Sequence, residues 1–141
     1  MSTVLWANYL LDNGQVVCDE SDKYALYRHQ RKLAKLSRRL GVVDFELACD
    51  STDFRFNLNQ LELPAGMSSS DELMARDGVW INGDQAVMML QGLLDALTAK
   101  PQRFGLLKDD YAEVMEELRE SLTFAQTAAQ HNARFNFCVV M

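Results

Sequence analysis

The longest apolar stretch of the chain falls in residues 79–101 and predicts a helix that is buried on several sides. Between Asp84 and Ala99, the positions able to face water are confined to one narrow stripe of this helix. That stripe contains Asp84, Met88, Gln91, Asp95 and Thr98. Asp84 is expected to cap the first helical amides, and Pro101 cannot continue the helix. Gly92 costs about 1 kcal/mol relative to alanine in mid-helix, so we expect another backbone to pack closely there.

A β-hairpin is predicted at the N-terminus. Two apolar segments, residues 3–11 and 15–18, flank Asp12-Asn13-Gly14. Asn-Gly between apolar segments favours a type I′ turn, because both central residues of that turn need positive φ.

A second helix is predicted from Ser21 or Asp22 to Leu40, with Gly41 just past its end. Its apolar seam also includes His29. The leucines of that seam are Leu26, Leu33, Leu36 and Leu40. A lone histidine in such a seam is interpreted as a hydrogen-bonded core residue rather than as a ligand.

The C-terminal part of the chain predicts a long helix followed by a strand. Residues 108–132 have apolar positions at helical spacing. Residues 134–141 alternate between apolar and polar and end in an apolar run, which is typical of an inner, paired strand.

The middle of the chain gives weaker signals. Residues 42–50 fit a strand or a short helix capped by Asp44, and the pattern does not decide between them. Residues 54–58 alternate in the manner of a strand, and residues 71–76 predict a short helix capped by Ser69 or Ser70. The expected fold is α+β, with three main helices packed on an antiparallel sheet, an N-terminal hairpin and a C-terminal strand.

Composition indicates one domain spanning residues 1–141. The chain has 141 residues, of which 48% are hydrophobic, so its core needs no disulfide or structural metal. Its three cysteines, Cys18, Cys49 and Cys138, are odd in number and far apart, which favours free thiols. The N-terminus lacks the pattern of a signal peptide. We therefore expect a soluble cytoplasmic protein without cofactor or metal.

Charge is segregated along the chain. Residues 1–40 carry seven basic and four acidic side chains, whereas residues 41–141 carry seven basic and sixteen acidic ones, which together give the net charge of −6. Six cations between residues 28 and 39 are predicted to line the polar side of the second helix, and we call them the basic face. They are Arg28, Arg31, Lys32, Lys35, Arg38 and Arg39. Three interpretations stay open for this face: a surface that is solvated or paired internally with acidic residues 113–120, a protein-binding surface, and a nucleic-acid-binding surface.

The sequence contains no Gly-rich phosphate loop, no His-x-x-x-His, no paired Cys-x-x-Cys and no Gly-x-Ser-x-Gly motif. The densest polar cluster is residues 50–55, in which Asp50, Asp53 and Arg55 are candidates for binding a polar ligand or a divalent ion. The same residue types also satisfy the amides of a turn, so no residue is assigned a catalytic role.

Three short segments carry a resemblance. The layout of residues 10–22, the Asp-Gly-Val-Trp of residues 77–80 and the Arg-Phe-Asn-Phe of residues 134–137 are similar to small, single-domain bacterial proteins of unknown function. The resemblance implies a bacterial cytoplasmic protein and assigns no functional residue.

The leading hypothesis is a non-enzymatic protein-interaction module, for instance a toxin-neutralising or regulatory protein, that binds another protein through the basic face. The first alternative is a nucleic-acid-associated protein that acts through the basic helix, residues 23–39. The second is a metal-dependent or hydrolytic enzyme that uses the cluster from Asp50 to Arg55. No membrane association is expected, and homo-oligomerisation is left open.

Overall fold

The computed structural model describes residues 2–141 and confirms the α+β class. Five strands and six α-helices, with one short 3-10 helix (η1), make up this part of the chain. In chain order they are β1 (Val4–Leu10), β2 (Val16–Cys18), α1 (Tyr24–Arg28), α2 (Gln30–Leu40), η1 (Phe45–Ala48), β3 (Cys49–Asp50), α3 (Thr52–Asn57), α4 (Ser70–Asp77), β4 (Ile81–Asn82), α5 (Gly83–Ala99), α6 (Tyr111–Gln130) and β5 (Arg134–Val140).

The C-terminal strand β5 is the centre of the sheet, as its apolar pattern predicts. The strand order is β2-β1-β5-β3, and β4 also pairs with β5. Strand β1 is antiparallel to β5 over its whole length, from Val4 opposite Val140 to Leu10 opposite Arg134. The other edge of β5 is shared by β4, which is antiparallel, and by β3, which forms the one parallel pairing among residues 2–141.

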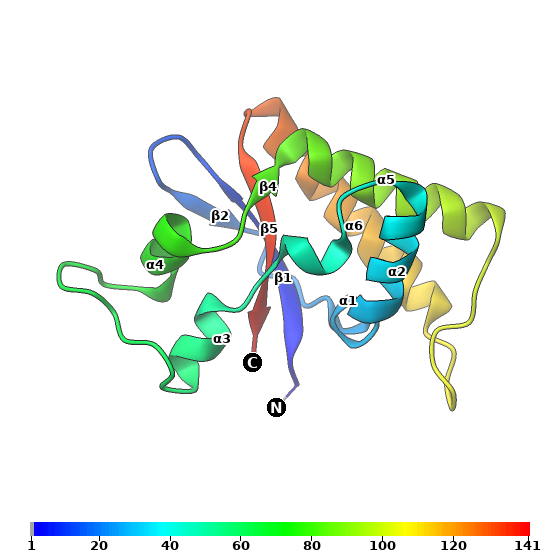
Figure 1. The fold of residues 1–141 in the computed structure, drawn as a ribbon, viewed down its shortest axis with the longest axis horizontal. Coiled ribbons are helices and arrows are strands. Elements are labelled where there is room, and N and C mark those ends of the chain that lie inside the picture. Colours follow the sequence, from blue (N-terminus) through cyan, green and yellow to red (C-terminus); the bar gives the residue numbers. More distant parts are fainter. Residues whose placement is uncertain (1) are drawn as a thin grey trace.

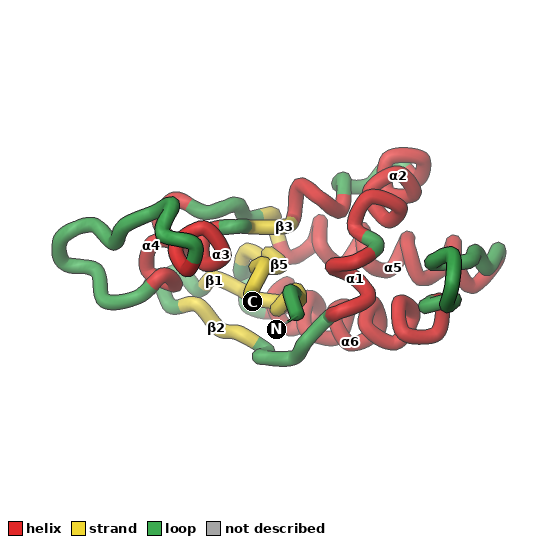
Figure 2. The backbone as a smooth tube through the Cα atoms, turned by 90° about the horizontal axis from the view of Figure 1, so that it is seen from below, coloured by secondary structure: helices red, strands yellow, loops and turns green. Residues whose placement is uncertain are grey.

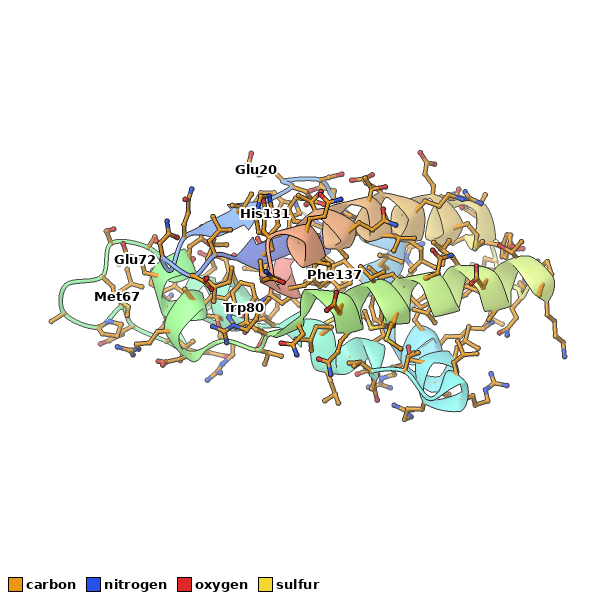
Figure 3. All side chains as sticks on the ribbon, turned by 90° about the horizontal axis from the view of Figure 1, so that it is seen from above. Glu20, Met67, Glu72, Trp80, His131 and Phe137 are labelled. Carbon is orange, nitrogen blue, oxygen red and sulfur yellow. The ribbon has the colours of Figure 1, made fainter. Side chains whose placement is uncertain are left out.

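The sheet separates two layers of helices (Figures 1 and 2). Helices α1, α2, α5 and α6 lie on one side, where alternate sheet residues such as Leu5 and Phe137 join the main core. Helices α3 and α4 lie on the other side, where Val4, Met74 and Cys138 form a smaller cluster. Figure 3 shows Phe137 between α5 and α6 near the middle of the view, and Met67 in the long loop at the left end.

The apolar helix α5 ends as predicted and exposes the predicted stripe. Asp84, Met88, Gln91, Asp95 and Thr98 are all exposed, while Leu90 and Leu93 are fully buried. The predicted N-cap is wrong. Asn82 caps the helix in a capping box with Gln85, whose side chain accepts a hydrogen bond from the Asn82 amide at 3.2 Å.

The close backbone approach on α5 occurs at Gly83 rather than at Gly92. A Cβ atom at Gly83 would lie 2.8 Å from the backbone nitrogen of Ala129 and the carbonyl oxygen of Ala133. At Gly92 the nearest atoms to such a Cβ belong to side chains, the first of them Val42 at 3.7 Å. The expectation for Gly92 is therefore wrong, and Gly83 allows α5 to meet the end of α6.

The predicted second helix is interrupted at His29. The side-chain amide of Gln30 donates to the carbonyl of Tyr27 at 3.0 Å, and His29 has a non-helical φ of −110° and ψ of 22°. Two helices result, α1 and α2, and Gly41 ends the second in a left-handed conformation with φ of 74°, as predicted.

Three local predictions meet different outcomes. Residues 54–57 are helical in α3 and Leu58 is its C-cap, so the strand prediction is wrong. Asp44 caps η1 by accepting from the amide of Glu46 at 2.9 Å, so residues 45–48 form a short helix, and residues 49–50 form the strand β3. The hairpin forms, but its turn is not type I′, because Gly14 has positive φ and Asn13 does not.

Candidate partner-binding site

The basic face spans the end of α1 and all of α2. Arg28 ends α1, and the other five cations follow one another along the outer side of α2. Leu33, Ala34, Leu36 and Ser37 fill the inner side of that helix and are buried. The sequence prediction that these cations share one surface therefore agrees with the geometry of α2.

Three of the six cations are held by other parts of the chain. Arg28 donates to Asp110 at 3.0 Å and lies over the Tyr24 ring, 4.4 Å from its centroid. Lys32 donates to the carbonyl of Arg103, and Arg38 pairs with Asp44. These contacts fix α1 and α2 to their surroundings, so half of the basic face has a structural role.

The other three cations, Arg31, Lys35 and Arg39, are exposed and form no ion pair within residues 2–141. Arg31 borders an open depression of about 670 Å³ at the junction of α1 and α2, where Glu46 is the single acidic lining residue. Lys35 and Arg39 border a second depression of about 440 Å³. This surface has free positive charge on a helix that is itself held in place.

The acidic residues of α6 do not neutralise the basic face. Glu117 accepts hydrogen bonds from the amides of Ala25 and Leu26, at 3.3 and 3.0 Å, and so caps α1 from outside. Burial raises the pKa of Glu117 above its usual range, although these two hydrogen bonds act to lower it. Other acids of this stripe pair elsewhere, Glu113 with Lys108 and Glu120 with Lys23.

A loop next to the basic face exposes two adjacent leucines. Leu106 and Leu107 are 95% and 101% exposed. Arg103 donates to the carbonyls of Gly105 and Leu106, at 2.8 and 3.0 Å, so its own side chain braces the loop. The ammonium group of Lys32 joins this loop to α2, where it lies 4.7 Å from the centroid of the buried Phe104 ring. Contiguous exposed apolar side chains mark contact surfaces, so these two adjacent leucines are a candidate contact point.

The polar cluster of residues 50–55 is mostly used within the fold. The carboxylate of Asp50 is buried and accepts from the amides of Thr52 and Val79, each at 2.8 Å. Asp53 accepts from the Ser70 hydroxyl at 2.7 Å and from the Asn57 amide group at 3.1 Å. These bonds join the start of α3 to α4 and to the segment before β4, which favours a structural role for both carboxylates.

The remaining member of that cluster, Arg55, is exposed and forms no ion pair with either carboxylate in the described chain. Partial burial, and then the charge of Asp53, raise the pKa of Asp71 nearby.

Across residues 2–141, no group of three or more His, Cys, Asp or Glu side chains is arranged to hold a metal ion. None of the helices in that range is long and apolar enough to span a membrane.

Sequence reasoning missed Leu106 and Leu107. Two consecutive leucines between Gly105 and Lys108, without helical or strand periodicity around them, were the available signal.

Compared with models of protein families, with curated proteins and with solved structures, the chain shows no significant match. No residue role can therefore be transferred to this site from another protein.

Proposed function

We propose that the protein is a non-enzymatic interaction module that binds a protein partner through α2 and the adjoining loop, with an acidic patch of the partner facing the free cations of α2. One observation carries the proposal. The unpaired cations Arg31, Lys35 and Arg39 stand on the same helix that Lys32 ties to the loop exposing Leu106 and Leu107. Apolar side chains provide contact area in an interface, and surrounding charges provide orientation and rate of association.

A protein partner is favoured over nucleic acid by the surroundings of this surface. The leucine loop is followed by Asp109 and by Glu113 and Glu116 of α6, which a polyanion would meet as repulsive charges. The net charge of −6 acts in the same direction. A protein surface can match charges of both signs. Toxin neutralisation or regulation in a bacterial cytoplasm is part of this proposal, and the three unpaired thiols support a reducing compartment.

The test compares proteins captured by three forms of the chain. The first is the wild type, and the second carries Arg31→Glu, Lys35→Glu and Arg39→Glu. The third is a charge-matched control with Arg55→Glu, Arg119→Glu and Arg134→Glu, three exposed positions outside α2. Each captured protein is identified by mass spectrometry and purified, and its affinity is then measured by calorimetry at low and high salt.

We expect the purified partner to bind the wild type and the control alike, and to bind the α2 variant at least about tenfold more weakly. Its affinity should also fall when Leu106 and Leu107 are both replaced by serine. A partner that binds the α2 variant as tightly as the wild type contradicts the proposal. Tight binding of mixed DNA or RNA by the wild type at physiological salt would instead identify a nucleic-acid-associated protein.

A further inference from the structure

A second candidate site lies at the end of the sheet where both chain termini are found (Figure 1). A depression of about 430 Å³ opens there between β1, β5 and the start of α1. Val4 and Val140, which are paired across the two strands, are buried and form its apolar base. This depression shares no lining residue with those on the basic face.

Two aromatic rings and one carboxylate line the depression above that base. Trp6 lies on the same face of β1 as Val4, because side chains two residues apart in a strand point to the same side. Tyr24 begins α1, and its side chain is 42% exposed. Asp22 accepts a hydrogen bond from the Trp6 indole at 2.7 Å, which holds its carboxylate beside the ring. An apolar base, two aromatic rings and one carboxylate therefore meet in one depression.

We infer that this depression binds a compact quaternary ammonium group. The face of an aromatic ring attracts cations, most strongly cations that lose their hydration easily. A primary ammonium group is strongly hydrated and would have to shed that water against Val4 and Val140. A trimethylammonium group presents methyl groups to the apolar base and still carries the charge that Asp22 and the two rings attract.

The Tyr24 ring already attracts a cation in this fold. The Arg28 guanidinium lies 4.4 Å from its centroid, and Asp110 neutralises that guanidinium at 3.0 Å. Arg28 therefore adds little repulsion against a ligand cation, whereas the Asp22 carboxylate has no ion-pair partner within the described residues.

Choline is the probe, and 3,3-dimethylbutan-1-ol, which has the same shape without the charge, is its neutral control. Binding is followed by calorimetry and by the NMR shift of the Trp6 indole N–H, assigned with Trp6→Phe. We expect saturable binding of choline, with the neutral alcohol at least about tenfold weaker. Phosphatidylcholine vesicles distinguish the source of the group. Co-sedimentation indicates a lipid headgroup, and choline binding without co-sedimentation indicates a soluble ligand.

Asp22→Asn provides the sharpest variant, because the amide oxygen can still accept from the Trp6 indole while the charge is removed. It should weaken choline binding about fivefold or more without moving the unfolding temperature. Asp12→Asn, in the exposed hairpin turn, is the matched control and should bind choline as the wild type does. The assignment is wrong if choline does not bind, if the neutral alcohol binds equally well, or if Asp22→Asn binds choline like the wild type.

Discussion

His29 and Asp110 meet at the point where the basic helix is interrupted, with 2.8 Å between Nε2 of His29 and Oδ2 of Asp110. The same carboxylate accepts from Arg28, so one buried acid holds both residues at the end of α1. Asp110 also precedes α6, and its amide donates to the carbonyl of Phe104 at 2.7 Å. The contact therefore links the leucine loop and two helices in one place.

Stability should depend on the ionisation of Asp110. The hydrogen bond with His29, followed by that with Arg28, lowers the pKa of this carboxyl from its ordinary value of 3.8. The ionised form therefore stabilises the fold above pH 3.8, and that contribution is lost as the pH falls through the lower, folded-state pKa. Asp110→Asn should lower the denaturation midpoint at pH 7, and the difference from the wild type should shrink towards pH 2.

Asp12→Asn is the control for this measurement, since Asp12 is an exposed carboxyl in the hairpin turn. It should leave the midpoint unchanged at both pH values. A difference between Asp110→Asn and the wild type that stays constant from pH 7 to pH 2 would show that the carboxylate charge does not stabilise this junction.

A buried lysine provides a second test of the fold. Lys23 is fully buried, pairs with Asp19, lies 3.3 Å from Glu120 and donates to the carbonyl of Ser21 at 2.8 Å. Its removal leaves Asp19 partly buried without a counter-ion, and breaking such a pair costs about 3–5 kcal/mol.

Lys23→Ala should therefore lower the free energy of unfolding by about 3 kcal/mol in urea denaturation. Lys23→Met should lose less, because it keeps the packing of the side-chain stem. Lys100→Ala, at an exposed lysine just after α5, should change it by less than about 0.5 kcal/mol. Equal losses for Lys23→Ala and Lys100→Ala would mean that the ion pair adds nothing.

Most of the fold was predictable where burial alone decides the local structure. The prediction of the exposed stripe of α5, from Asp84 to Thr98, is confirmed. Sixteen residues with helical apolar periodicity determine which side of the helix faces the core. The strand β5 was predictable for a similar reason, since it is covered on both faces and its apolar run is long.

Short segments were decided by individual hydrogen bonds instead. Phe54 and Phe56 alternate like a strand, but Asp50 fixes the turn before them and Asp53 bonds Asn57 one helical turn later. The capping box of Asn82 and Gln85 was visible in the sequence, yet Asp84, two residues after Asn82, offered an equally acceptable cap.

The candidate site was predictable only in part. The charges of the basic face follow from helical spacing, but two of its held cations have partners far away in sequence, Asp110 for Arg28 and the carbonyl of Arg103 for Lys32. Tertiary packing decides which cations lack an ion-pair partner. It also decides that the loop with Leu106 lies next to them.

The burial of α5 can be measured with two substitutions on the same helix. Leu90 is fully buried, whereas Met88 is 64% exposed. Leu90→Ala should lower the free energy of unfolding by about 2–5 kcal/mol, through lost apolar burial and the cavity that remains. Met88→Ala should change it by less than about 0.5 kcal/mol. Similar values for the two variants in guanidinium denaturation would refute the position of α5 in the core.

The two glycines of α5 should respond oppositely to alanine. Gly83→Ala places a methyl group 2.8 Å from backbone atoms of Ala129 and Ala133, and such overpacking costs about 1–3 kcal/mol. Gly92→Ala meets only ordinary contact at 3.7 Å and should stabilise the protein by up to about 1 kcal/mol, because alanine is the better helix former. Chemical denaturation of both variants decides the matter, and destabilisation by Gly92→Ala would mean that Val42 cannot accommodate the methyl group.

The three cysteines should be unpaired and slow to react. No disulfide joins Cys18, Cys49 and Cys138, and burial raises the pKa of Cys18 to about 11 and that of Cys138 to about 12. Burial also raises the pKa of Cys49. The thiolate is the reactive form, so at pH 8 each folded thiol should react with Ellman's reagent far more slowly than free cysteine does. Three thiols per chain should react at once in denaturant without reductant. One reactive thiol per chain under those conditions would reveal an internal disulfide, and rapid reaction of the native protein would show that burial does not protect the thiols.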